Sequence, residues 1–267
     1  MTAGTGADGL LSWEMRDGVA LIGLNRPAKR NAISDAVIAA IDEAVARAEA
    51  EARAGVIFGH GGNFSAGLDL AEQAERSALD DLENSRRWGR AFDRIQRGRL
   101  PWFAALQGAV IGGGLELAAA VHVRVADETA YFALPEGQRG IYTGGGASVR
   151  VARLMGAHRM ADMMLTGRVV TAAEAEAWGV VQYRVPAGEA LARAEALARK
   201  AASNAPLSNF AIIQALPRIQ DMSHEDGLFA ERLMAALTMT TPEARANLRA
   251  FLEKRAGRLA VPDEADD

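Results

Sequence analysis

Two glutamates, Glu116 and Glu136, stand where the chain can combine proton transfer with the binding of a negative charge. Glu116 ends a glycine-rich run, Gly108–Glu116, that follows apolar residues and enters an alanine-rich stretch. Glycines let a backbone approach a ligand closely, and the first N–H groups of a helix have no partner within the helix. Such N–H groups stabilise a developing oxyanion, and a carboxylate one turn later can transfer a proton. The run therefore predicts a site that combines both functions.

A second small-residue turn, Phe64–Leu70, can also present backbone N–H groups. Glu136 follows Pro135 at the end of an expected strand, 131–134. Addition of water to a double bond needs one group to take a proton from water and another to give one to carbon. Two carboxyl groups facing one substrate meet this need, and the set suits enolate chemistry on an acyl thioester. Taken singly, Glu116 is also explained by the helix dipole, and Glu136 by a solvated turn.

These segments, taken in order, resemble the crotonase, or enoyl-CoA hydratase/isomerase, family over nearly the whole chain. The fold that the resemblance implies is α/β, a crotonase-like spiral of ββα units with a C-terminal helical trimerisation region. The activity that it implies is the hydration of an enoyl-CoA thioester. Each motif alone is weak and the ordered set is specific: Leu24-Asn25-Arg26-Pro27 with Asn31-Ala32, Phe64 to Leu70, Gly112 to Glu116, Pro135-Glu136, Leu165-Thr166-Gly167 and Phe251-Leu252-Glu253-Lys254-Arg255.

The resemblance also assigns the reacting groups. Glu116 and Glu136 match the two catalytic acids of the family, and the N–H groups of Leu68 and Gly113 match its oxyanion hole. A backbone donor does not depend on the identity of its side chain, so Leu68 is acceptable there, and its side chain is expected to line the acyl pocket. Removing one such donor typically lowers the rate by about 10²–10³-fold.

The resemblance further maps contacts with coenzyme A, which is part of the substrate. Lys29 and Lys254 match contacts with its phosphates, and Ala28 and Ala66 match backbone contacts with its adenine. Either lysine alone is equally well explained as a solvated surface residue. No metal and no redox cofactor is expected.

Two further residues are candidates for the acyl pocket. Trp88 belongs to a charged, helical segment, 71–97, that covers this pocket in the family, although a tryptophan there also suits the core. Gly144 begins the run Gly144–Gly146, which can seat water or acyl oxygens. The preceding Thr143 departs from the family, which usually has proline at this position.

His122 is a second departure, because the family commonly has aspartate six residues after the first glutamate. Its neighbours in the run Val121–Val125 alternate between apolar and polar residues, so we predict a histidine with a structural role. The alternative is a catalytic histidine, as in crotonase relatives that hydrolyse diketones.

Composition excludes several classes of protein and partner. The 267 residues, 49% of them hydrophobic, can bury one sizeable core. The chain has no cysteine, which excludes disulfides and thiolate sites, and its four histidines lack metal-ligand spacing. A net charge of −4 gives no attraction for nucleic acid. No run reaches the roughly 20 apolar residues of a membrane span and 1–9 does not resemble a signal peptide, so we expect no membrane partner and a cytoplasmic location.

The pattern of elements divides the chain into two regions. Strand-like and helical segments alternate up to about residue 185, which predicts stacked β/α units. Ser34 is the expected cap of a helix whose apolar face is Val37, Ile38, Ile41, Val45 and Ala48. Beyond residue 186 the patterns are helical only, at 187–203, 207–216, 225–239 and 242–256. We therefore predict a spiral core over 1–200 and a helical region over 201–267 that packs subunits, as a homotrimer or hexamer by resemblance.

Other activities are compatible with the same residues. Within the family these are enoyl-CoA isomerisation, a hydratase-lyase reaction on aromatic acyl-CoAs, and diketone hydrolysis. From another class, the chain could be a non-catalytic acyl-CoA-binding protein. The presence of both Glu116 and Glu136 favours hydration, because members that isomerise or hydrolyse often lack one of the pair.

Overall fold

The computed structural model describes residues 4–5, 9–69 and 77–253. By its internal contacts the chain divides into two compact units, Met1–Ser203 and Asn204–Asp267. Each unit is described on its own below. The predicted boundary at residue 200 lies three residues before this division.

The first unit is built on two sheets. A seven-stranded sheet has the order β1-β2-β3-β4-β5-β7-β10, and a three-stranded sheet has the order β6-β8-β9. In the large sheet β1, β2 and β3 are antiparallel, and each later neighbour pair is parallel. Its strands are β1 (Gly4–Thr5), β2 (Leu11–Arg16), β3 (Val19–Leu24), β4 (Ala54–Gly59), β5 (Trp102–Leu106), β7 (Val123–Asp127) and β10 (Tyr183–Val185). Those of the small sheet are β6 (Ala109–Ile111), β8 (Tyr131–Ala133) and β9 (Val170–Thr171).

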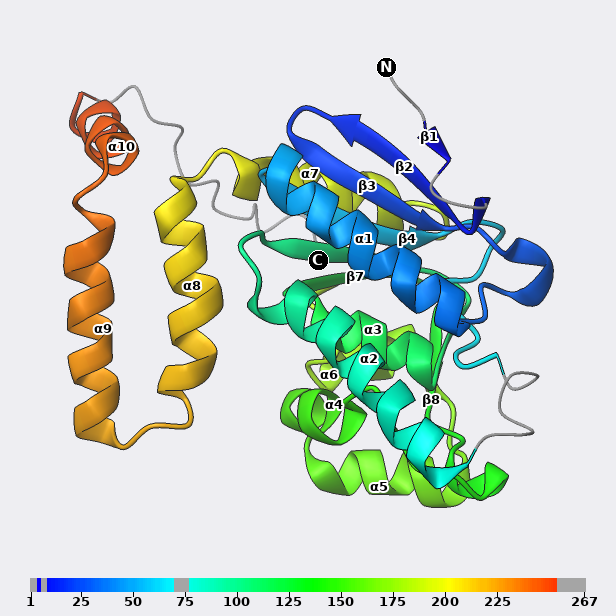
Figure 1. Cartoon of the computed structure of the whole chain (residues 1–267). Coiled ribbons are helices and arrows are strands. Elements are labelled where there is room, and N and C mark those ends of the chain that lie inside the picture. Colours follow the sequence, from blue (N-terminus) through cyan, green and yellow to red (C-terminus); the bar gives the residue numbers. More distant parts are fainter. Residues whose placement is uncertain (1–3, 6–8, 70–76, 254–267) are drawn as a thin grey trace. The chain divides into compact units, whose positions relative to one another are not determined.

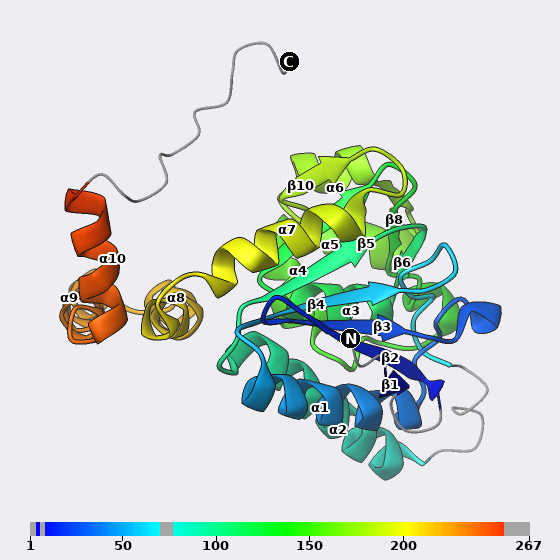
Figure 2. The same ribbon diagram turned by 90° about the horizontal axis from the view of Figure 1, so that it is seen from above.

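Helices follow the strands of this unit and cover the large sheet on both faces (Figure 1). Figure 2 shows α7 on the opposite side of the large sheet from α1 and α2. The helices are α1 (Asp35–Glu51), α2 (Ala78–Arg97), α3 (Gly113–Ala120), α4 (Ala147–Met155), α5 (Ala157–Thr166), α6 (Ala172–Ala177) and α7 (Ala190–Ala202). Two short 3₁₀ turns, η2 (Pro27–Lys29) and η4 (Gly137–Arg139), lie in loops.

The alternation of side chains along β3 creates two separate cores. Ala20, Ile22 and Leu24 pack into the larger core together with α1, α2 and α3, whereas Val19 and Leu21 pack against α7. Successive residues of a strand point to opposite faces, so a strand buried on both sides is apolar throughout. The α7 face is completed by the small residues Ala190, Ala194, Ala198 and Ala202.

Local signals in the sequence explain where these elements begin. Ser34 caps α1 by accepting a hydrogen bond from the N–H of Val37, as predicted, and the expected apolar face is buried. Asp17 and Gly18 both have positive φ, which suits the two-residue turn between β2 and β3. The strand predicted over 121–125 is instead β7, two residues later, and the helix predicted over 187–203 is α7 at 190–202. The predicted helix at 71–97 is described as α2 from Ala78, with 70–76 outside the described residues.

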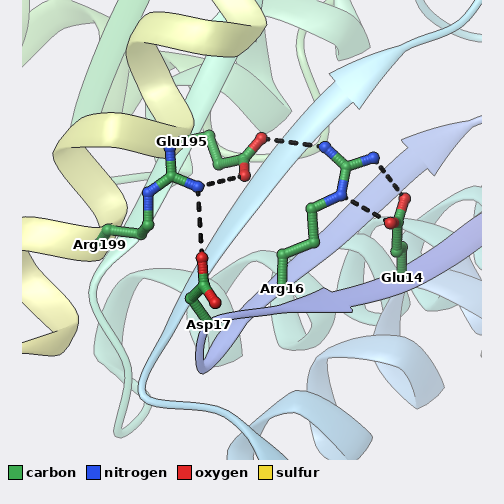
Figure 3. A network of polar contacts seen from close by, with 5 residues as sticks. All are labelled: Glu14, Arg16, Asp17, Glu195 and Arg199. Carbon is green, nitrogen blue, oxygen red and sulfur yellow. Dashed lines mark hydrogen bonds and ion pairs between the residues drawn. The ribbon is translucent and has the colours of Figure 1, made fainter. Parts of the chain in front are cut away.

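An ion-pair network on the outer surface joins α7 to the β2–β3 hairpin (Figure 3). Arg16 contacts both Glu14 and Glu195, and Arg199 contacts both Glu195 and Asp17. Glu195 is the buried member, with a side chain 9% exposed. The network therefore ties a buried carboxylate to two arginines that solvent also reaches.

The second unit is helical in the part that the structure describes. It consists of α8 (Pro206–Ile219), α9 (His224–Thr238) and α10 (Pro242–Leu252), close to the segments that the sequence predicts. Ser223 caps α9 and Thr241 caps α10, each by accepting a backbone hydrogen bond. In α9 the residue Gly227 alone is buried, and α10 buries none of its residues.

Candidate active site

A cavity of about 320 Å³ in the first unit collects most of the predicted site residues. Both glutamates line it, as do the two predicted amide donors. Three of the other predicted residues contribute to its wall. The predicted members of its lining are Ala66, Leu68, Trp88, Gly113, Glu116, Glu136 and Gly144. Segments far apart in sequence therefore meet at one site.

The backbone nitrogens of Leu68 and Gly113 lie next to each other. A Cβ atom built on Gly113 would lie 3.5 Å from the nitrogen of Leu68, and one on Gly67 would lie 3.2 Å from the nitrogen of Gly113. Gly113 is the first residue of α3, where backbone N–H groups have no partner in the helix. Neither N–H donates a hydrogen bond to another residue in the part of the chain that the structure describes. The pair is thus available to a ligand oxygen.

Hydrogen bonds on both sides hold the Leu68 turn in place. The N–H of Ile33 donates to the carbonyl of Gly67 at 2.8 Å, and the N–H of Asp69 donates to the carbonyl of Ile33 at 2.9 Å. The buried Ser65 hydroxyl donates to the carbonyl of Asn31 and accepts from the N–H of Gly67. Gly67 has φ +87°, and a Cβ there would lie 2.5 Å from the carbonyl oxygen of Ile111. Only glycine fits this position without strain.

Trp88 of α2 packs directly on the start of α3. A Cβ on Gly113 would lie 2.6 Å from Cζ3 of Trp88, and one on Gly114 would lie 2.7 Å from the carbonyl oxygen of Ser65. The two glycines are therefore required by the close approach of neighbouring groups. Trp88 itself is 4% exposed and stacks edge to face on Phe92. It serves both the core and the wall of the cavity.

Glu116 is a buried carboxyl group fixed by backbone donors. Its side chain is 4% exposed, and Oε1 accepts hydrogen bonds from the N–H groups of Gly145 at 2.8 Å and Ala147 at 3.0 Å. Burial raises the pKa of Glu116, and these two hydrogen bonds and the charge of Arg150 oppose the rise. Arg150 donates to the carbonyl of Gly145 at 2.7 Å and so fixes the same loop. The carboxyl group is thereby oriented before any substrate binds.

Glu136 is a second buried carboxyl group with a different environment. Burial raises its pKa to about 7, with a further contribution from the charge of Glu116, while Arg139 acts in the opposite direction. Its Oε2 is buried without a hydrogen-bond partner among the described residues. A Cβ on Gly112 would lie 3.0 Å from its Oε1, which places the carboxyl group beside the start of α3. Glu136 is therefore able to exchange a proton near neutral pH.

The predicted coenzyme A residues lie beside the Leu68 turn. The N–H of Ala66 donates to the carbonyl of Arg30, which follows η2 with its Ala28 and Lys29. Ala28 and Lys29 do not line the cavity. The ammonium of Lys29 lies 3.2 Å from Asp69, and its side chain is 56% exposed. Lys254 lies outside the described residues.

Asp69 anchors this loop to the turn. Its carboxylate accepts from Arg26 at 2.9 Å as well as from Lys29. Burial acts to raise the pKa of Asp69, but hydrogen bonds from Arg26 and Lys29 outweigh it and lower the pKa. The ion pair thus stays formed over the physiological pH range.

His122 lies outside the cavity lining and is held by hydrogen bonds, an arrangement that agrees with the predicted structural role. Its Nδ1 accepts from the N–H of Trp102 at 2.9 Å, and Nε2 lies 3.2 Å from the carbonyl oxygen of Gln96, to which it donates. Burial lowers the pKa of His122 to about 4, so the ring is neutral. It precedes β7 and does not line the cavity.

The sequence interpretation missed several cavity residues. Asp81, Asn84 and Ser85 line the cavity together with Trp88, and all four belong to one face of α2. Their spacing of three, four and seven residues was the available signal, because such positions neighbour one another on a helix. The Ser85 hydroxyl donates to the carbonyl of Gly144 at 2.6 Å. On the other wall, Arg139, Ile141, Tyr142 and Thr143 were also missed as lining residues.

The fold and the site together define a protein of the crotonase class. Residues 14–259 match the family described as enoyl-CoA hydratase/isomerase. The chain belongs to the enoyl-CoA hydratase/isomerase family. The resemblance stated from the sequence, and the fold class with it, are thereby confirmed.

Individual relatives agree over nearly their full length. An enoyl-CoA hydratase of Mycobacterium tuberculosis is 32% identical, over 96% of this chain and 97% of its own. A 2,3-dehydroadipyl-CoA hydratase of Escherichia coli is 36% identical, over 89% and 93%. The crystal structure of a Rhodopseudomonas palustris protein, 50% identical, has a TM-score of 0.90 and covers 95% of this chain and 98% of that one.

The described residues contain neither a candidate metal site nor a candidate membrane span. No group of three or more histidine or carboxylate side chains there could hold a metal ion. No helix in the same part of the chain is long and apolar enough to cross a membrane.

Proposed function

We propose that this protein adds water across the 2,3 double bond of an enoyl-CoA thioester. The observation that carries this is one cavity that holds two unpaired backbone N–H groups and two buried carboxyl groups. Hydratases among the relatives support the same reaction. The description of the family also names isomerases, so the experiment below includes a substrate for isomerisation.

The backbone pair would act on the thioester. Its carbonyl oxygen accepts hydrogen bonds from the N–H groups of Leu68 and Gly113. As water adds to C3, the electrons of the double bond move towards this oxygen and form an enolate. Donors already in place stabilise that charge without reorganising, which is the main source of catalysis in such sites.

The two carboxyl groups would divide the proton transfers. Glu116 is assigned as the base, because the two backbone hydrogen bonds to its Oε1 favour the ionised carboxylate. It takes a proton from water while the water oxygen bonds to C3. Glu136, with its pKa near 7, gives a proton to C2. The two steps together add one OH to C3 and one H to C2. A proton then passes from Glu116 to Glu136 and restores the starting state. No metal or redox cofactor takes part in this proposal.

Coenzyme A would lie along the loop beside the turn. In this proposal Ala28 and Ala66 meet its adenine through backbone groups, and Lys29 and Lys254 meet its phosphates. Leu68, Trp88 and Gly144 would form the wall around the acyl group. A homotrimer or hexamer and a cytoplasmic location belong to the same proposal, which the family membership supports.

An absorbance assay tests the reaction. Hydration of crotonyl-CoA removes the enoyl-thioester absorbance, and chromatography then identifies 3-hydroxybutyryl-CoA. A 3-enoyl-CoA substrate in parallel tests for isomerisation. Turnover of the 3-enoyl compound without hydration of any 2-enoyl-CoA would replace hydratase with isomerase, and binding without turnover of either would indicate a non-catalytic acyl-CoA-binding protein.

A further inference from the structure

Buried polar atoms without partners gather at the cavity. Of the described residues, four have buried side-chain nitrogen or oxygen atoms with no hydrogen-bond partner. Three of the four, Trp88 Nε1, Glu136 Oε2 and Thr143 Oγ1, belong to residues that line the cavity. Nearly all buried polar groups in native proteins have a partner, so such a concentration indicates that a ligand supplies it.

The proposed reaction explains only one of the three atoms. Glu136 Oε2 would meet the reacting carbon or water. The indole N–H of Trp88 can only donate, and the hydroxyl of Thr143 can donate or accept, so both suit an oxygen that belongs to the ligand. An apolar acyl chain has no hydrogen-bonding atom for these two groups, and a buried donor left without a partner destabilises the complex.

Arg139, the last residue of η4, contributes a positive charge to the lining of the cavity. Its side chain forms no hydrogen bond or ion pair with any residue that the structure describes. It is close enough to Glu136 for its charge to influence that carboxyl group. Several other arginines of the first unit, by contrast, are held by carboxylates, as Arg94, Arg150 and Arg168 are.

The cavity lining also contains a negatively charged residue, whose repulsion of a bound anion is expected to be weak. Asp81 lines the cavity from the first turn of α2. A carboxylate at that position is stabilised by the N-terminus of its own helix, which reduces its effect elsewhere. Arg139 has no such compensation, apart from Glu136 when that group is ionised.

From these placements we infer that the acyl group of the substrate carries a carboxylate at its far end, bound by Arg139 and the hydroxyl of Thr143. The substrate class is then a short α,β-unsaturated dicarboxylic acid joined to coenzyme A at one end. This deepens the proposed hydratase function and rests on it for the reacting end of the substrate. An arginine–carboxylate pair adds geometric selectivity as well as affinity, because the guanidinium can donate two parallel hydrogen bonds.

Binding of two saturated thioesters separates this inference from the reaction. Hexanoyl-CoA and adipyl-CoA have the same chain length and differ in a terminal methyl or carboxylate. By isothermal titration calorimetry, we expect the intact protein to bind adipyl-CoA about tenfold more tightly, which corresponds to the lower end of what a hydrogen bond to a charged group contributes. Equal affinity for the two compounds would overturn the inference.

Variants then assign the preference to residues. Arg139→Gln should abolish the adipyl preference, and Thr143→Val should reduce it, while hexanoyl-CoA affinity stays near that of the unaltered protein. Asp81→Asn should increase the preference slightly. Arg90→Gln is the matched control, because Arg90 is exposed and does not line the cavity. A preference that survives Arg139→Gln unchanged would contradict the role of Arg139.

Turnover of the matching 2-enoyl compounds distinguishes the two proposals. If both compounds are hydrated but bind equally, the hydratase function stands and the dicarboxylate inference fails. If adipyl-CoA is preferred through Arg139 but neither 2-enoyl compound is hydrated, the inference stands and the hydratase function fails. Free adipate, added as a competitor of adipyl-CoA, tests whether the dicarboxylate alone accounts for binding. It should compete only weakly because it lacks coenzyme A.

Discussion

Helix α3 and helix α9 show opposite ways of using apolar residues. All eight residues of α3 are buried, whereas α9 buries Gly227 alone. Phe229 and Leu233 of α9 are 61% and 50% exposed. Helix α3 is covered entirely by other residues of its own unit, so it can hold a catalytic group rigidly. Helix α9 leaves exposed an apolar surface of a kind that monomers rarely expose, and we propose that it packs against another subunit.

The largest expected effects concern the carboxyl group that α3 carries and its partner. Glu116→Gln and Glu136→Gln should each lower kcat for crotonyl-CoA by about 10²–10⁴-fold, the usual contribution of a general acid or base. Glutamine at position 116 keeps the oxygen that accepts from Gly145 and Ala147, so the loop stays in place. Thermal unfolding should show that both variants fold. Near-normal hydration in either variant would remove that residue from the mechanism.

The tight packing of α3 predicts the next effect. Gly113→Ala keeps the backbone N–H but adds a methyl group 2.6 Å from Cζ3 of Trp88. Because a misplacement of about 1 Å can cost roughly 10²-fold, kcat should fall to that extent. Trp88→Leu in the same chain should restore part of it by making room. Gly113→Pro would be less informative, since it removes the donor and adds bulk at once.

The exposed face of α9 predicts a change in assembly. We expect a trimer or hexamer by light scattering, and Phe229→Glu with Leu233→Glu should shift the protein to smaller species. Placing charges on a surface buried between subunits costs far more than placing them in water. Arg232→Glu, an exposed position on the same helix, is the control. An unaltered protein that is monomeric at micromolar concentration would refute the role assigned to this unit.

Local patterns in the sequence sufficed for much of the fold and part of the site. Ser34 and its apolar stripe predicted α1, and the glycine run predicted the start of α3, because caps, periodicity and unpaired N–H groups are local properties. The start of β7 was placed two residues early, since His122 is held by hydrogen bonds to segments 20 or more residues away. Tertiary contacts of this kind leave no local pattern.

The environment of the site could be predicted less well than its position. That Glu136 has an unpartnered oxygen and a pKa near 7 depends on burial by several segments. That Arg139 lines the cavity depends on where η4 lies in the folded unit. The roles of the catalytic and coenzyme A residues stay predictions until they are tested.

Burial of Glu136 predicts a stability effect that depends on pH. Its pKa is about 7 in the folded protein against an ordinary value of 4.5. Between these values the folded state binds more protons, so this group's contribution to stability is present at low pH and is lost as the pH rises through 7. Relative to Glu136→Gln, the unaltered protein should lose on the order of 1–3 kcal/mol between pH 4.5 and 8. Urea unfolding measures this, with the exposed Glu43→Gln as control. A constant difference across this range would show that Glu136 is not desolvated.

The smallest effect is expected at the network that joins α7 to the β2–β3 hairpin (Figure 3). Arg16→Ala should cost less than about 1 kcal/mol, because Arg16 is 47% exposed and such pairs contribute little. The buried Glu195 keeps Arg199 at 2.6 Å in that variant. Changing Arg199 to alanine as well leaves the buried carboxylate unpaired, so the double variant should lose more than the sum of the two single changes. Urea unfolding of the three variants measures the coupling. Additive losses would mean that solvent reaches Glu195 once the arginines are gone, and that apolar packing alone holds α7 to the sheet.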